Sequence, residues 1–134
     1  MKVKMQISNI LIVDKADSHL LLLKWILQNK DYMAYTANNI KEAKAFIRLY
    51  QLHLILLNPL LSDDEGIEFL EYCHKQNYIK TIPVIVISQE QKTSIINKAL
   101  DLGIADYIIR PYNINNLINK IEINLKQNKN RNCI

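Results

Sequence analysis

The residues best suited to chemistry are polar side chains that directly follow short apolar runs of the chain. These residues are Asp14, Lys15, Asn58, Ser88 and Arg110. The carboxyl ends of parallel strands meet at one edge of a sheet, and open α/β sheets bind their ligands there, so we expect one shared site. It would hold one carboxylate, one amide, one hydroxyl and two cations. Asn58 matters most, because it ends a fully apolar run and an amide is not an oxygen nucleophile.

The apolar runs alternate with segments of helical periodicity, which predicts alternating strands and helices. Strands are expected at Ile7–Val13, Tyr32–Ala37, Leu54–Leu57, Pro83–Ser88 and Tyr107–Ile109. Helices are expected at Ser18–Gln28 (mostly buried), Ile40–Tyr50, Gly66–Gln76, Lys92–Leu102 (ended by Gly103) and Ile114–Lys126. Four of the strands are apolar almost throughout, as in a parallel sheet covered on both faces. With right-handed crossovers, this order predicts an α/β fold, a doubly wound three-layer α/β/α sandwich.

The length of 134 residues fits a single domain, which we place at 1–126, followed by a polar tail or the start of a linker at 127–134. The net charge of +4 comes from five cations near the two ends, without which the body carries −1. A nucleic-acid surface needs clustered cations on a folded face, so we do not expect this domain to bind nucleic acid.

Two further features bear on localisation. No apolar run approaches the roughly 20 residues needed to span a bilayer, so no membrane association is expected. Cys73 and Cys133 stand alone, without the spacing of a metal site or a redox motif. Together these features favour a reduced, cytoplasmic protein. Cys73 is expected in the core, and Trp25 is expected to be either a core residue or a switch residue.

Several segments in combination resemble the receiver domains of bacterial response regulators. They are ILIVD at 10–14, LILLN at 54–58 with Gly66 eight residues after Asn58, PVIVIS at 83–88 and ALDLGIADYIIRPY at 99–112. The resemblance covers about residues 8–126. It implies a flavodoxin-like (CheY-like) fold with a five-stranded parallel sheet in the order 2-1-3-4-5. It also implies that the protein acts in two-component (phosphorelay) signal transduction and is not an enzyme.

In that family, an aspartate after the third strand accepts a phosphoryl group from a histidine kinase. An acidic pair after the first strand helps that aspartate to hold Mg²⁺, and a Ser/Thr and a Lys grip the phosphoryl group. Matched by position, Asp14 is the first acid, Lys15 replaces the second acid, Asn58 stands at the acceptor position, Ser88 is the hydroxyl and Arg110 replaces the lysine. Pro111 follows Arg110 as in the family, where that peptide bond is usually cis.

These departures predict a degenerate, pseudo-receiver site. An amide has no negative charge, and Mg²⁺ prefers hard oxygens that usually include one or two carboxylates. The formal charge at the three acidic positions of the family falls from −3 to 0, so Mg²⁺ binding should be weak or absent. Lys15 or Arg110 can instead occupy the space and pair with Asp14.

Such a domain would act through recognition. In the family, signals leave through a face that corresponds here to Lys92–Leu102, Ala105–Ile109 and Ile114–Leu125, and Ser88 and Tyr107 match the residues that couple pocket and face. We expect a protein partner on this face: a histidine kinase, an output domain or a second copy in a homodimer.

Other functions stay open at this point. Asp63 or Asp64 could serve as a displaced phosphoacceptor in a working receiver. The chain could be the amino-terminal regulatory domain of a longer DNA-binding regulator. A flavin-binding protein of the same architecture is less well supported, because the loops at the strand ends offer few phosphate-binding amides. The three histidines show no i, i+4 pair that would favour a metal site.

Overall fold

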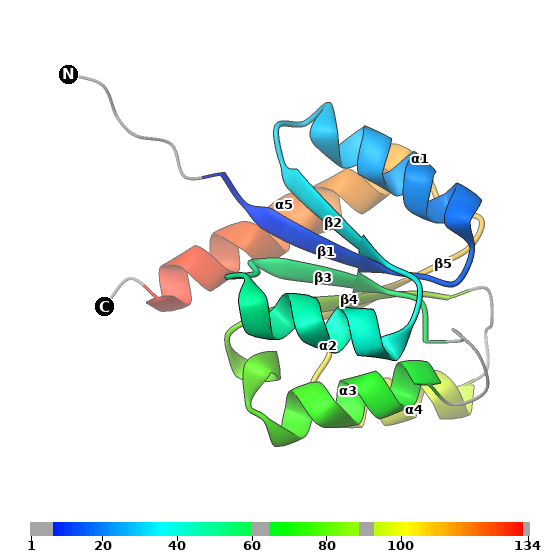
Figure 1. The fold of residues 1–134 in the computed structure, drawn as a ribbon, viewed down its shortest axis with the longest axis vertical. Coiled ribbons are helices and arrows are strands. Elements are labelled where there is room, and N and C mark those ends of the chain that lie inside the picture. The colour runs from blue at the N-terminus through cyan, green and yellow to red at the C-terminus, as the bar shows by residue number, and fades with distance from the viewer. Residues whose placement is uncertain (1–6, 60–64, 89–92, 133–134) are drawn as a thin grey trace.

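The structure is a computed structural model that describes residues 7–59, 65–88 and 93–132. Its strands are β1 (Asn9–Val13), β2 (Met33–Ala37), β3 (Leu54–Leu57), β4 (Val84–Ser88) and β5 (Asp106–Ile109). Its helices are α1 (Asp17–Gln28), α2 (Ile40–Leu49), α3 (Glu65–Lys75), α4 (Thr93–Asp101) and α5 (Ile114–Asn132), with a short 3₁₀ turn at Tyr78–Lys80. The strands form one parallel sheet in the order β2-β1-β3-β4-β5, which confirms the expected flavodoxin-like α/β fold (Figure 1).

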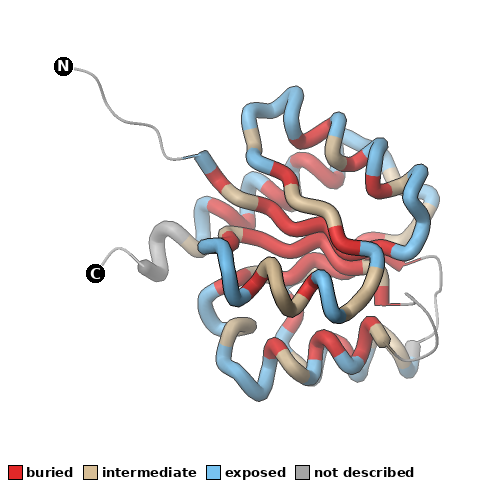
Figure 2. Tube along the Cα trace, in the orientation of Figure 1, coloured by how far each residue is buried: buried red, intermediate tan, exposed pale blue. Residues whose placement is uncertain are grey.

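Two hydrophobic layers cover the sheet, one on each face. Alternate residues of β1 divide between them, so that Leu11 and Val13 pack under α2, α3 and α4, whereas Ile10 and Ile12 pack under α1 and α5. This period of two is the geometry of a strand. The central strands β3 and β4 are buried along their whole length (Figure 2). The sheet is therefore a rigid base for the residues at its carboxyl edge.

Helix α1 is amphipathic, although its sequence predicted a mostly buried helix. Leu20, Leu23, Ile26 and Leu27 face the sheet and are buried. Leu21, Leu22 and Trp25 are 69%, 46% and 66% exposed, so Trp25 is not the core residue that was one of the two alternatives predicted for it. The reason is geometric: a helix on the surface of a sheet buries only one stripe, whatever residues stand on its other side.

Helix α5 continues well past the end predicted from the sequence. Apolar periodicity stops near residue 126, but the helix runs to Asn132, so most of the predicted polar tail is helical. Extending a docked helix adds one backbone hydrogen bond for each residue fixed, and this needs no apolar face. The domain boundary predicted at residue 126 therefore falls inside α5.

Cys73 lies in the core as expected, with 1% of its surface exposed. Burial, only partly offset by the nearby Lys44 cation, raises the pKa of its thiol to about 12. The side chain is therefore an apolar packing element at neutral pH. Within the described residues, no helix is both long and apolar enough to cross a bilayer.

Candidate functional site

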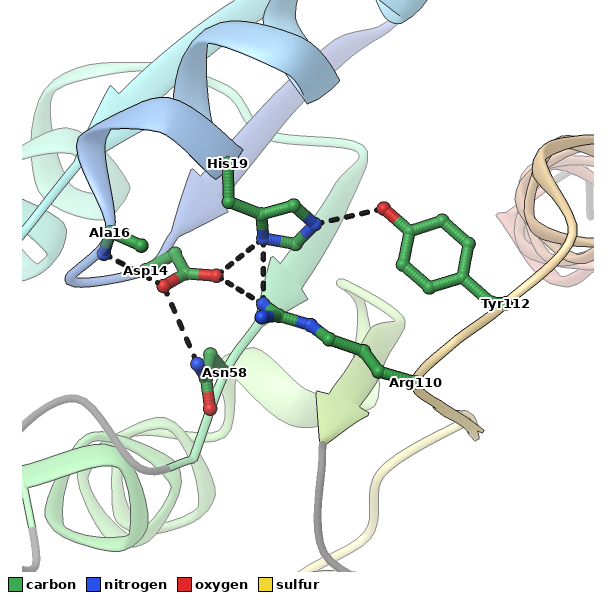
Figure 3. A network of polar contacts seen from close by, with 6 residues as sticks. All are labelled: Asp14, Ala16, His19, Asn58, Arg110 and Tyr112. Atoms are coloured by element: carbon green, nitrogen blue, oxygen red, sulfur yellow. Dashed lines mark hydrogen bonds and ion pairs between the residues drawn. The ribbon is translucent and has the colours of Figure 1, made fainter.

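The carboxyl edge of the sheet brings together Asp14, Asn58 and Arg110, which follow β1, β3 and β5 (Figure 3). Backbone hydrogen bonds fix all three positions. Asn58 N donates to Val13 O at 2.9 Å, and Arg110 N donates to Ser88 O at 2.8 Å. Asp14 N donates to Ala37 O at 3.1 Å. The side chains are thus positioned by the sheet itself and not by flexible loops.

Asp14 is the centre of a polar network and is 3% exposed. Its Oδ2 accepts from Arg110 Nη2 at 2.7 Å and lies 2.6 Å from His19 Nδ1. Its Oδ1 accepts from Ala16 N at 3.0 Å and, at 3.4 Å, from Asn58 Nδ2. Figure 3 shows these groups converging on the one carboxylate. Both oxygens are therefore engaged by groups of this chain.

His19 and Tyr112 also belong to the site, although neither was selected as a site residue from the sequence. His19 Nε2 lies 2.8 Å from Tyr112 Oη, and His19 Nδ1 lies 2.7 Å from Arg110 Nη2. With its proton on Nδ1, the imidazole donates to Asp14 and accepts from Tyr112. This tautomer fits because a carboxylate oxygen only accepts hydrogen bonds, so the ring nitrogen beside Asp14 Oδ2 carries the proton. The available signal was that His19 lies in the first turn of the helix that follows Asp14.

The electrostatics of the network favour an ionised Asp14. Burial alone would raise the pKa of Asp14, but hydrogen bonds from His19 and Ala16 N and the positive charge of Arg110 outweigh it. The net effect holds the pKa below the ordinary value of 3.8. Burial, partly offset by Arg110, raises the pKa of Tyr112, which keeps its hydroxyl neutral. The buried anion thus has a partly buried cation beside it.

The remaining predicted site residues lie in different places. Lys15 is exposed, and the cation that pairs with Asp14 is Arg110. Ser88 is buried, with 3% of its surface exposed, at the end of β4, whereas Tyr107 is 39% exposed. The peptide bond between Arg110 and Pro111 is cis. Asp63 and Asp64 lie outside the described residues.

Gly66 in α3 packs directly against the segment that follows Asn58. A Cβ at Gly66 would collide with the carbonyl group of Pro59. This close approach explains why a glycine stands eight residues after Asn58. Across the part of the chain that the structure describes, no group of three His, Cys, Asp or Glu side chains could hold a metal ion.

The fold and the polar edge define a class: a flavodoxin-like α/β domain whose site lies where its parallel strands end. Residues 10–122 match the model of the response regulator receiver domain. The chain therefore belongs to the response regulator receiver domain family.

Relatives and solved structures agree with this assignment. The chain is 32% identical to the nisin biosynthesis regulatory protein NisR of Lactococcus lactis over 118 residues, which are 88% of this chain and 50% of that protein. It is 34% identical to the transcriptional regulatory protein KdpE of Staphylococcus aureus, with coverage of 87% and 49%. The chain thus spans about half the length of these relatives. A receiver domain (CheY-like) structure from Methanospirillum hungatei superimposes with a TM-score of 0.87 at 28% identity, covering 94% of this chain and 99% of that one.

Proposed function

We propose that this receiver domain does not accept a phosphoryl group and signals by protein–protein contacts that are independent of phosphorylation. The observation that carries the proposal is the pairing of Arg110 with Asp14 beside the amide of Asn58. Phosphoryl transfer to a side chain needs an oxygen nucleophile, and the Asn58 amide does not supply one.

The residues at this edge do not fit Mg²⁺. The ion takes octahedral oxygen ligands, usually with one or two carboxylates among them. Among the residues that the structure describes, Asp14 is the only carboxylate in contact at this site, and its two oxygens are taken by Arg110, His19, Ala16 and Asn58. A divalent ion would have to displace the Arg110 guanidinium, which lies 2.7 Å from Asp14, and it would obtain only one carboxylate ligand in exchange. Weak or absent Mg²⁺ binding is therefore part of the proposal.

The proposed docking face combines α4, β5 and α5, and its partner is a kinase, an output domain or a second copy in the cytoplasm. Apolar side chains of this face are open to solvent: Leu100 is 46% exposed, Tyr107 39% and Ile123 44%. The ion pair of Lys120 with Asp106, at 3.0 Å, joins α5 to β5 on this face. Exposed apolar groups with a polar surround are typical of interaction surfaces.

The experiment is incubation of the protein with Mg²⁺ and a small phosphodonor such as acetyl phosphate, followed by intact-mass measurement. We expect no phosphoryl adduct and no binding of beryllofluoride. A receiver that has aspartate at the acceptor position, treated in the same tube, shows that the donor is active. An adduct would refute the proposal, and peptide mapping to Asp63 or Asp64 would establish a displaced acceptor instead.

A second candidate role concerns the whole protein. The two curated relatives named above are regulatory proteins about twice as long as the matched segment, and KdpE is a transcriptional regulator by name. These lengths support a role as the regulatory domain of a longer DNA-binding protein. The native reading frame tests this directly: a DNA-binding domain encoded downstream would support it, and a stop codon after residue 134 would contradict it.

A further inference from the structure

The outer side of α1 carries an apolar stripe that nothing in the proposed signalling face uses. Leu21 is 69% exposed and Trp25 is 66% exposed, and the two lie one turn apart on the same side of the helix. Trp25 is the only tryptophan of the chain. Large exposed apolar groups mark interaction sites, and tryptophan is enriched among residues that dominate binding energy.

A hollow lies beside the first half of the same helix. It has a volume of about 620 Å³ and is mostly apolar, and its lining is His19, Leu22, Arg110, Pro111, Tyr112 and Ile114. Leu22 and Ile114 are apolar residues of this lining, and each is 46% exposed. The helix therefore presents a protruding indole near its carboxyl end and a hollow near its amino end.

The charges along the stripe are self-complementary. Asp17 and Lys24 are seven residues apart, close to two full turns, so they stand on one flank of the helix about 10 Å apart. Neither forms an ion pair with another described residue. A two-fold axis between these two residues would bring a second, antiparallel copy of the helix alongside. Asp17 of each copy would then lie opposite Lys24 of the other.

We propose that a second copy of this chain docks on α1, with the two α1 helices antiparallel around a two-fold axis close to Leu21. Asp17 of each copy then meets Lys24 of the other, and the two Leu21 side chains face each other. Trp25 of each copy lies over the first turn of the opposite helix, at the mouth of the hollow. An isologous interface must be complementary to itself, and this stripe has that property in charge and in shape. A foreign partner would not require the symmetry.

Sedimentation of the full 134-residue chain over a range of concentrations tests the proposal. We expect a reversible dimer, with the emission of Trp25 shifting to shorter wavelength as the dimer forms. Leu21→Asp should weaken dimerisation about tenfold or more, because it buries a charge at the two-fold axis. Leu49→Asp is the matched control, since Leu49 on α2 is 75% exposed, and it should leave the dimer unchanged.

Charge reversal tests the geometry itself. Asp17→Lys alone and Lys24→Asp alone should each weaken the dimer, because each places like charges opposite one another at two contacts. Mixing the two variants should restore dimerisation, since the heterodimer regains both attractive pairs. A simple loss of folding in either variant cannot produce this rescue.

The remaining outcomes overturn the proposal. A chain that stays monomeric at all concentrations contradicts the proposal. A dimer that persists in Leu21→Asp also contradicts it, as do charge variants that fail to form a dimer when they are mixed. A dimer lost with Leu100→Asp instead belongs to the face of α4, β5 and α5. None of these measurements involves phosphorylation, so their failure leaves the proposed function untouched.

Discussion

Arg110 Nη2 lies 2.7 Å from Asp14 Oδ2, although 96 positions separate the two residues in the sequence. Asp14 follows β1 and Arg110 follows β5, and β3 and β4 lie between these strands in the sheet. The arginine therefore extends across the carboxyl edge of the sheet to reach the carboxylate, and it meets Asp14 beside Asn58 (Figure 3). One long cation thus ties the two ends of the site together.

Removing this cation should destabilise the fold. In Arg110→Met, the carboxylate of Asp14 stays buried without its charged partner, which costs about 3 kcal/mol of unfolding free energy. Urea denaturation measures the loss. The matched control is Lys98→Met, since Lys98 and Glu71 form an exposed pair at 3.7 Å whose contribution is about 0.5 kcal/mol or less. Equal effects of the two substitutions would contradict this account of the site.

The same network predicts a pH dependence. The folded pKa of Asp14 lies below 3.8, so its contribution to stability is fully present above that value and is lost as the pH falls through the lowered pKa. The difference in unfolding free energy between the wild type and Asp14→Asn should therefore be constant near neutral pH and shrink in acid. Denaturant titrations at several pH values measure it. Asp101→Asn, at an exposed position, is the control, and a difference that grew in acid would refute the assignment.

The fold could be predicted well from the sequence because segments with the apolar period of a strand alternate with segments that have the apolar period of a helix. Buried runs such as Leu54–Leu57 can be recognised from composition alone. Helix α1 could not be described correctly, since apolar residues stand on both its buried and its exposed sides. The end of α5 was missed because helix propagation beyond the core leaves no apolar pattern.

From the sequence we expected Asp14, Asn58 and Arg110 at one edge of the sheet, with Lys15 or Arg110 paired with Asp14. That Asp14, Asn58 and Arg110 meet follows from where strands end. Sequence could not decide between Arg110 and Lys15 as the partner of Asp14, because side-chain reach and direction are three-dimensional properties. The inclusion of His19 depends on how the first turn of α1 faces the edge, which spacing alone leaves open.

Restoring the acceptor should require more than one substitution. In Asn58→Asp, the new carboxylate would lie close to Arg110, which already pairs with Asp14. We therefore expect no Mg²⁺ binding and no phosphorylation of this single variant at millimolar Mg²⁺. Adding Lys15→Asp and Arg110→Lys supplies a third carboxylate and withdraws the guanidinium. This triple variant should bind Mg²⁺, measured by calorimetry, and gain a phosphoryl group from acetyl phosphate.

The two intermediate variants identify the blocking group. The double variant Asn58→Asp with Arg110→Lys removes the guanidinium but still lacks the second acid. The double variant Asn58→Asp with Lys15→Asp supplies the second acid but keeps the guanidinium. We expect the larger gain in Mg²⁺ affinity when Arg110 is replaced, because Arg110 contacts Asp14 and Lys15 is exposed. Phosphorylation of Asn58→Asp alone would show that Arg110 does not obstruct the site.

Gly66 should be essential for the placement of the segment that carries Asn58. In Gly66→Ala, the new methyl group collides with the Pro59 carbonyl, so either α3 or the Asn58–Pro59 segment must shift. We expect a loss of about 1–3 kcal/mol in unfolding free energy, together with a changed amide chemical shift for Asn58. The control is Gly103→Ala, at a φ of +97° in the loop before β5, where a methyl group is strained by the backbone but meets only Ile79. That variant should lose about 1 kcal/mol with no change at Asn58. A Gly66→Ala variant as stable as the wild type, with the Asn58 signal unmoved, would show that α3 does not hold this segment in place.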